Sequence, residues 1–167
     1  MDILVSDTSV IIDLERAQLI EEIFSLPFRF VVPGALFERE MRDYGGEKLV
    51  ALGLEVWNLT GTRVQEAQRL RGLERRISVH DSYALALAKT EGAMVLTGDG
   101  ALRVLAEAEG VRCHGVLWVF DQLEDKRLVA SAELNVGLTR LAVHPRCRLP
   151  REEIDLRLTR YNTSQKS

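Results

Sequence analysis

Three aspartates stand at positions where a strand-like run ends or a helical run begins. They are Asp7 in LVSDTSVIIDL, Asp81 in ISVHDSYALALA and Asp99 in MVLTGDG. Carboxylates a few Å apart repel one another and raise each other's pKa unless a cation neutralises them. Hard oxygen ligands of this kind suit Mg²⁺ or Mn²⁺. Together with a glutamate from VVPGALFEREM, the three aspartates therefore predict an acidic metal cluster.

Two glutamates compete for the fourth position in this cluster, because FERE contains both Glu38 and Glu40. On a helix, Glu40 shares a face with the apolar or aromatic residues Leu36, Phe37 and Tyr44. At the same spacings, the neighbours of Glu38 are Gly34, Ala35, Met41 and Arg42, of which only Met41 is a large apolar residue. We favour Glu40 and keep Glu38 as the alternative.

Each aspartate also has a plain structural interpretation. Asp7 precedes a helical run as an N-cap does, and Asp99 lies in GDG, an ordinary turn sequence. Asp81 follows Ser78 by three residues and so resembles the acid of a capping box. Asp81 also heads the apolar stripe of its helix, where burying a carboxylate is costly unless it is paired or bound to metal. This position favours a functional role for Asp81.

Polar neighbours could support the acids. Ser9 and Thr97 are placed to hydrogen-bond the acids or a metal-bound water, although turn and cap chemistry explains each of them as well. Asp13 in IIDLER is a candidate for a place just behind the metal ligands.

The elements that must position these residues follow one another as strand and helix. Strands are expected at 1–6, 28–32, 54–59, 93–97 and 111–115, and helices at 8–24, 36–44, 62–75, 79–91 and 101–110. This order predicts an α/β fold with a parallel sheet of four to five strands and helices on both faces. Ligands bind beyond the carboxyl ends of such strands, which is where Asp7 and Asp99 fall.

The rest of the chain is expected to be helical. Residues 116–142 have helical patterns, HPRCRLP is a turn, and EEIDLRLTRY is a last helix. We expect a single domain over residues 1–160, with a core at 1–120, a helical C-terminal extension at 121–160 and a flexible polar tail at 161–167.

Composition limits the classes of function. The apolar content of 46% and charged content of 28% are ordinary for a soluble globular domain of 167 residues. The net charge of −3 means that a nucleic-acid partner would need local basic patches. One candidate patch lies on helical segments, although a solvated helix face explains it better: Arg69, Arg71, Arg75, Arg76, Lys89 and Arg103.

Cys113 and Cys147 are far apart in the sequence and form no metal-ligand pattern, so we expect reduced thiols and a cytoplasmic protein. The sequence shows no signal peptide and no apolar run near the roughly 20 residues of a membrane helix. We therefore expect no membrane association.

The acidic segments together resemble the PIN-domain family, which includes the VapC-like ribonuclease toxins. DTSVIIDL, the glutamate after the second strand, HDSYALALA and LTGD occur in this order over residues 1 to 120. The remainder is similar to the helical stretch of PIN proteins that follows a G-x-L motif, here Gly115-Val116-Leu117. The resemblance implies a three-layer α/β/α PIN-like fold. It also implies four catalytic and metal-binding acids: Asp7, Glu40, Asp81 and Asp99.

The resemblance further implies a Mg²⁺- or Mn²⁺-dependent endoribonuclease, acting as the toxin of a type II toxin–antitoxin system. It implies an RNA substrate, a cognate antitoxin and a homodimer. In this interpretation Asp7 and Asp99 bind metal directly, whereas Asp81 and Glu40 complete the cluster or hold metal-bound water.

Two other functions stay open. One is a catalytically silent PIN-like RNA-binding or scaffold module, against which the four intact acids argue. The other is a Mg²⁺-dependent phosphotransfer or phosphatase domain with a phosphoacceptor aspartate after the first strand. The chain has no D-x-D pair after that strand and no clear lysine partner for a phosphoryl group, which weighs against the second alternative.

Overall fold

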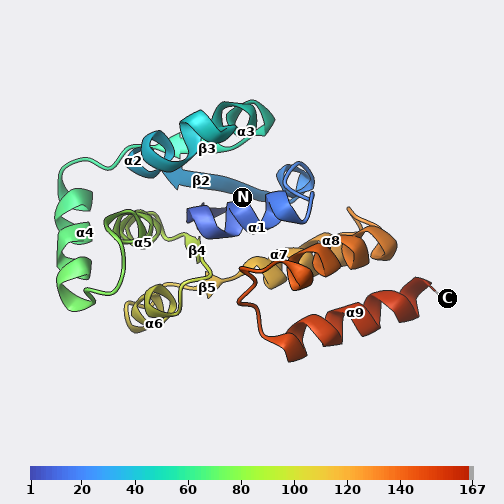
Figure 1. Cartoon of the computed structure of the whole chain (residues 1–167). Helices are drawn as coiled ribbons and strands as arrows, with labels where there is room; N and C mark the ends of the chain where they lie inside the picture. Colours follow the sequence, from blue (N-terminus) through green and yellow to red (C-terminus); the bar gives the residue numbers. More distant parts are fainter. Residues whose placement is uncertain (166–167) are drawn as a thin grey trace.

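The computed structural model describes residues 1–165 and contains one sheet of five parallel strands (Figure 1). The strand order is β3-β2-β1-β4-β5. The strands are β1 (Asp2–Ser6), β2 (Phe28–Pro33), β3 (Glu55–Trp57), β4 (Met94–Leu96) and β5 (Cys113–His114). Every neighbouring pair is parallel, so the carboxyl ends of all five strands lie along the same edge. The expected parallel sheet is confirmed, and 54–59 contributes an edge strand.

Helices cover both faces of this sheet. The α-helices in the described part of the chain are α1 (Thr8–Arg16), α2 (Gly34–Leu36), α3 (Gly46–Leu52), α4 (Thr62–Leu73), α5 (Val79–Glu91), α6 (Gly100–Ala108), α7 (Val116–Asp125), α8 (Ser131–Val143) and α9 (Arg151–Gln165). Three short segments of other helical types are η1 (Glu22–Ser25), η2 (Phe37–Met41) and η3 (Arg42–Tyr44). None of the described helices is long and apolar enough to cross a membrane.

Alternation along the strands divides the core into two layers. Leu4 and Phe30 face a core built with α1, α7, α8 and α9, whereas Val5 and Val31 face a core built with α4, α5 and α6. Successive strand residues point to opposite faces of a sheet, which is why neighbours in the sequence belong to different cores. The result is the expected three-layer α/β/α arrangement.

The first helix is shorter than the sequence predicts, because α1 ends at Arg16 instead of continuing to residue 24. Gln18 adopts the left-handed conformation with φ of 58°. Its N–H donates to the Glu15 carbonyl (3.0 Å), and the next N–H, of Leu19, donates to the Leu14 carbonyl (2.9 Å). These are the two bonds of a Schellman helix end, usually marked by glycine. Because this position holds glutamine and not glycine, the sequence contains no signal for the end of the helix.

The segment after β2 also departs from the single helix predicted at 36–44. The chain passes from α2 into the π-type turn η2 and the 3₁₀ turn η3. Gly45 then takes φ of 88°, and α3, which the sequence pattern did not reveal, begins at Gly46. Gly45 thus connects two helical segments, as left-handed glycines commonly do.

The last helix is longer than expected. α9 continues to Gln165 and includes most of the predicted tail. Tyr161 is fully buried in the same core as Leu4, so packing of the helix against the domain holds this region. Residues 166 and 167 of the predicted tail lie outside the described residues.

Candidate active site

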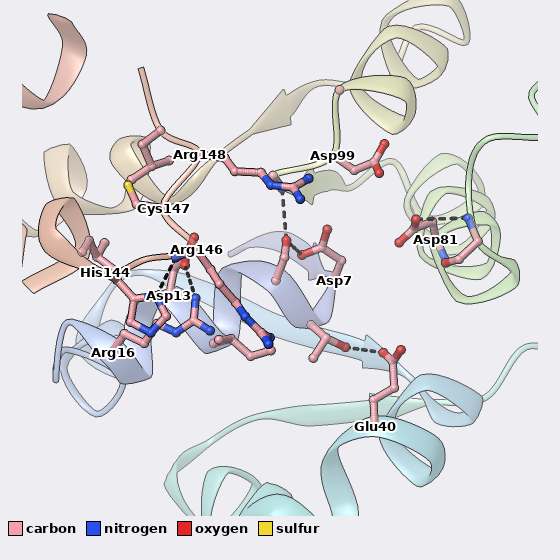
Figure 2. A pocket seen from close by; sticks show the side chains of 18 residues that line it. Asp7, Asp13, Arg16, Glu40, Asp81, Asp99, His144, Arg146, Cys147 and Arg148 are labelled. Atoms are coloured by element: carbon pink, nitrogen blue, oxygen red, sulfur yellow. Dashed lines mark hydrogen bonds and ion pairs between the residues drawn. The ribbon is translucent and has the colours of Figure 1, made fainter. Parts of the chain in front are cut away.

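The predicted acids are brought to one place by the pairing of the two central strands. Asp7 directly follows β1, and Asp99 is the third residue after the end of β4. Ser6 lies opposite Leu96 in the parallel ladder, and the Asp7 N–H donates to the Leu96 carbonyl at 3.0 Å. Asp81 comes from the first turn of α5, and Glu40 from η2 after β2. All four side chains line one cavity of about 490 Å³ (Figure 2).

Asp7 is the most deeply placed of these acids, with 4% of its surface exposed. Its carboxylate accepts hydrogen bonds from Thr97 Oγ1, from Ser9 Oγ (2.7 Å) and from the backbone N–H of Val10 (3.1 Å). Burial nevertheless raises the pKa of Asp7 to about 6, and the nearby charge of Asp81 adds to the rise. Burial therefore outweighs three hydrogen bonds that favour the ionised form.

Asp81 is the electrostatic centre of the group. Burial is the largest cause of its raised pKa, and the charges of Asp99 and Glu40 raise it further. Since Asp81 also raises the pKa of Asp7, its carboxylate interacts with all three others. The acids therefore share one electrostatic environment.

The helix-capping roles expected for the aspartates are present as well. Asp7 caps α1, and Asp99 caps α6 by accepting from the Leu102 N–H at 2.8 Å. Asp81 forms a capping box with Ser78, whose N–H donates to Asp81 Oδ2 at 3.2 Å. Capping and membership of the acidic cavity are thus compatible, because caps lie at the strand-to-helix junctions where the cavity forms.

The structure distinguishes the two competing glutamates by position. Glu40 lines the cavity and accepts a hydrogen bond from Thr8 Oγ1. Glu38 instead forms an ion pair with Arg42 and is absent from the cavity wall. Glu40 therefore remains our candidate for the fourth acid.

The donor set suits a hydrated divalent cation. Within residues 1–165, no group of three or more histidine, cysteine or acidic side chains is arranged closely enough to hold one metal ion. Mg²⁺ needs only one or two carboxylates, however, because it keeps several of its waters. Neighbouring carboxylates add to the raised pKa of Asp7 and to that of Asp81, and a bound cation would offset this repulsion. The chemistry of the residues therefore fits Mg²⁺ or Mn²⁺.

The opposite wall of the cavity was not predicted from the sequence; it comes from Arg16 and from the turn between α8 and α9. The residues of that turn on the wall are His144, Arg146, Cys147, Arg148 and Leu149. Asp13, which we expected just behind the acids, also lines this wall and lies 3.7 Å from Arg16. The available signal was the alternation of basic and apolar residues in HPRCRLP.

Three of the six residues in the predicted basic patch are held in ion pairs with acidic side chains. Arg69 and Lys89 both bind Glu66 and Glu109, at N–O distances of 2.7 to 2.9 Å. Arg76 binds Glu74 at 2.8 Å. None of the six predicted basic residues lines the acidic cavity. These pairs agree with the solvated-face interpretation for three of the six residues.

Comparison with known proteins agrees with this architecture. The family model described as DUF3368, PIN domain, matches residues 3–163. The fold is similar to that of a PilT N-terminus domain protein from the hyperthermophilic archaeon Sulfolobus solfataricus P2. The TM-score is 0.51 at 15% identity, with 73% of this chain and 94% of that chain covered. A comparison with curated proteins finds no match. Because the family match spans nearly all of the described residues, the chain belongs to the PIN domain family, a family of nucleases.

Proposed function

We propose that this PIN domain is a Mg²⁺- or Mn²⁺-dependent endoribonuclease. The observation that carries the proposal is the shared cavity of four carboxylates at the carboxyl edge of a parallel sheet. A phosphodiester is an anion and is repelled by such a cavity unless a cation stands between them. The buried, pKa-shifted Asp7 at its base supports a site built to hold a cation.

The chain's own residues would hold and orient the cation. Asp7 and Asp99 are the proposed direct ligands, while Asp81 and Glu40 would hold its waters or complete the cluster. Thr97 and Ser9 fix the Asp7 carboxylate through hydrogen bonds, and Thr8 does the same for Glu40. When bound, a divalent ion lowers the pKa of a coordinated water and neutralises charge on the scissile phosphate.

The test is cleavage of a mixed, structured RNA by purified protein in Mg²⁺ or Mn²⁺, compared with the same reaction in EDTA. We expect metal-dependent cleavage that Asp99→Asn lowers at least a hundredfold. Asparagine keeps an oxygen that can accept from the Leu102 N–H, so the cap of α6 is retained. Asp2→Asn, at the exposed opposite end of β1, is the matched control and should cleave like the wild type.

The paired substitutions Glu40→Gln and Glu38→Gln extend the same assay. Glu40→Gln should reduce cleavage, whereas Glu38→Gln removes only an exposed ion pair and should not. Full activity in Asp99→Asn would contradict the proposed site. Metal binding without cleavage of any RNA would instead favour a silent PIN module.

We also propose the toxin role, which rests on the resemblance to VapC-like proteins. Induced expression of the wild type should arrest growth, and expression of Asp99→Asn should not. An antitoxin that covers the cavity and a homodimer are parts of the same proposal. If Asp99→Asn still arrests growth, toxicity does not depend on RNA cleavage and the proposed toxin mechanism is wrong.

A further inference from the structure

The turn between α8 and α9 forms a basic wall across the cavity from the acids. Arg146 and Arg148 both line the cavity, and their side chains extend into the space that the acids border (Figure 2). Arg148 reaches toward Asp99, and Arg146 runs along the side nearer to Asp13 (Figure 2). The cavity therefore has an acidic side at the strand ends and a cationic side at the C-terminal turn.

The sequence of this turn explains why the arginines face the cavity. Burial alternates along it, with Arg146 and Arg148 exposed and with Cys147 and Leu149 half-buried against the core. The N–H of Cys147 donates to the His144 carbonyl (3.0 Å), and the N–H of Arg146 donates to His144 Nδ1 (3.1 Å). Pro145 and Pro150 restrict the backbone on either side. The two arginines are thus held by a packed turn.

Neither guanidinium is neutralised within the described part of the chain. Many other arginines of the protein form ion pairs with a carboxylate. Arg29 binds Glu55 and Arg157 binds Asp121, both at an N–O distance of 2.7 Å. Arg146 and Arg148 have no carboxylate oxygen within 4.0 Å among the described residues, although five acidic residues line the same cavity. Two unneutralised cations at one side of an acidic cavity are available to an anionic ligand.

We propose that Arg146 and Arg148 are positioning residues that bind the phosphates next to the scissile one. This inference rests on the proposed function and deepens it, because it specifies a polynucleotide with phosphates on more than one nucleotide as the substrate. A guanidinium stays charged at every working pH and presents a planar fork of donors that matches phosphate oxygens. Such phosphate contacts determine which phosphodiester of the RNA lies over the acids, and they carry no base specificity.

The experiment measures binding of a fluorescent single-stranded RNA oligonucleotide by anisotropy, over a series of salt concentrations, with Ca²⁺ in place of Mg²⁺. The proteins are the wild type, the double variant Arg146→Ala/Arg148→Ala, and Arg140→Ala. Arg140 is a matched control, since it is an exposed arginine on the adjoining α8 that does not line the cavity.

We expect the double variant to bind at least tenfold more weakly, at about 1.4 kcal/mol per factor of ten. The slope of log affinity against log salt should become shallower by about 1.4, because each lost phosphate contact removes about 0.7. Arg140→Ala should change neither quantity. Under cleavage conditions the double variant should show a raised KM with kcat largely retained, and Arg→Lys at both positions should restore part of the binding.

An unchanged salt slope in the double variant would overturn the inference. Increased cleavage would overturn it as well, since the guanidinium groups would then be competitors of the substrate. Failure of the proposed function is distinguishable from either result: wild-type protein would bind RNA with the expected slope yet never cleave it. Cleavage that is insensitive to both arginines would leave the nuclease standing and remove only this inference.

Discussion

The Asp7 carboxylate accepts three hydrogen bonds and still has a pKa of about 6. Its ordinary value is 3.8, so the folded protein without metal binds this proton more tightly than the unfolded chain does. Stability from Asp7 is therefore present at low pH and is lost as pH rises from about 4 to about 6. A shift of this size corresponds to about 3 kcal/mol, at about 1.4 kcal/mol per pKa unit.

Asp7→Asn should make the metal-free protein more stable at neutral pH. Asparagine carries no charge to bury and can still cap α1 by accepting from the Val10 N–H. In EDTA we expect a gain of up to about 3 kcal/mol in the free energy of unfolding at pH 8, fading toward pH 4. Urea unfolding across this pH range measures it, with Asp2→Asn as the control. A gain that is independent of pH would contradict the assigned cause.

At the residue scale, local sequence was enough to find the acids and too little to find the arginines. Asp7 and Asp99 follow apolar runs that read as strands, and chain order alone brings parallel strand ends to one edge. The choice of Glu40 over Glu38 agrees with the residue that lines the cavity. The alternation in HPRCRLP indicates that Arg146 and Arg148 point away from the core, but the packing of α8 against α9 decides that they reach this cavity.

At the scale of elements, the π-type turn η2 carries Glu40 into the cavity. The turn is packed closely against the start of α3. A Cβ added at Gly46 would lie 2.6 Å from the Met41 carbonyl oxygen and 2.8 Å from a ring carbon of Phe37. Either the helix start or the turn must move to admit it.

Gly46→Ala should therefore destabilise the protein by about 1–3 kcal/mol, the usual cost of forcing extra volume into a packed region. Because the turn holds Glu40, we also expect reduced cleavage at temperatures where the protein stays folded. Gly72→Ala, in the last turn of α4 with nothing within 4 Å of the new methyl group, is the control. It should be neutral or slightly stabilising. Thermal unfolding and the RNA assay together measure both effects.

Elements with strong end signals were predictable, and elements without them were not. Ser78, Asp81 and Gly92 mark both ends of α5, and the observed helix matches the predicted one. Gln18 ends α1 in a conformation that favours glycine, so the sequence predicted too long a helix. The breaks between α2, η2 and η3 occur where Phe37 and Met41 are buried in the core, and intrinsic helix propensity carries no information about such tertiary contacts.

At the scale of the whole molecule, α9 packs against the core on one face of the sheet. Its residues Ile154 and Tyr161 are buried in the same cluster as Leu4 on β1. Arg157 and Arg160 also bind Asp121 on α7, at 2.7 and 3.1 Å. The order of strands and helices predicted the three layers. It could not predict that the end of the chain is part of the core.

Tyr161→Phe should stabilise the protein. The buried hydroxyl has no hydrogen-bond partner in the described part of the chain, and leaving such a group unsatisfied costs about 1–3 kcal/mol. We expect a gain of about 1 kcal/mol by urea unfolding. Ile154→Ala, in the same helix and core, should lose about 2–5 kcal/mol. A loss in Tyr161→Phe would mean that the hydroxyl is bonded in solution.

The cavity takes its walls from distant parts of the chain, which matters for the order in which a ribosome makes them. Asp7 emerges early, whereas Thr97, which holds its carboxylate, comes 90 residues later and Arg148 later still. A nascent chain stalled after α6 would carry all four acids but would lack α7, α8 and α9, which contribute to one of the two core layers. We therefore expect such a chain neither to form the folded cavity nor to cleave RNA. With the proposed RNA cleavage, a site completed only by the C-terminal helices would leave the protein's own message and ribosome uncut during synthesis.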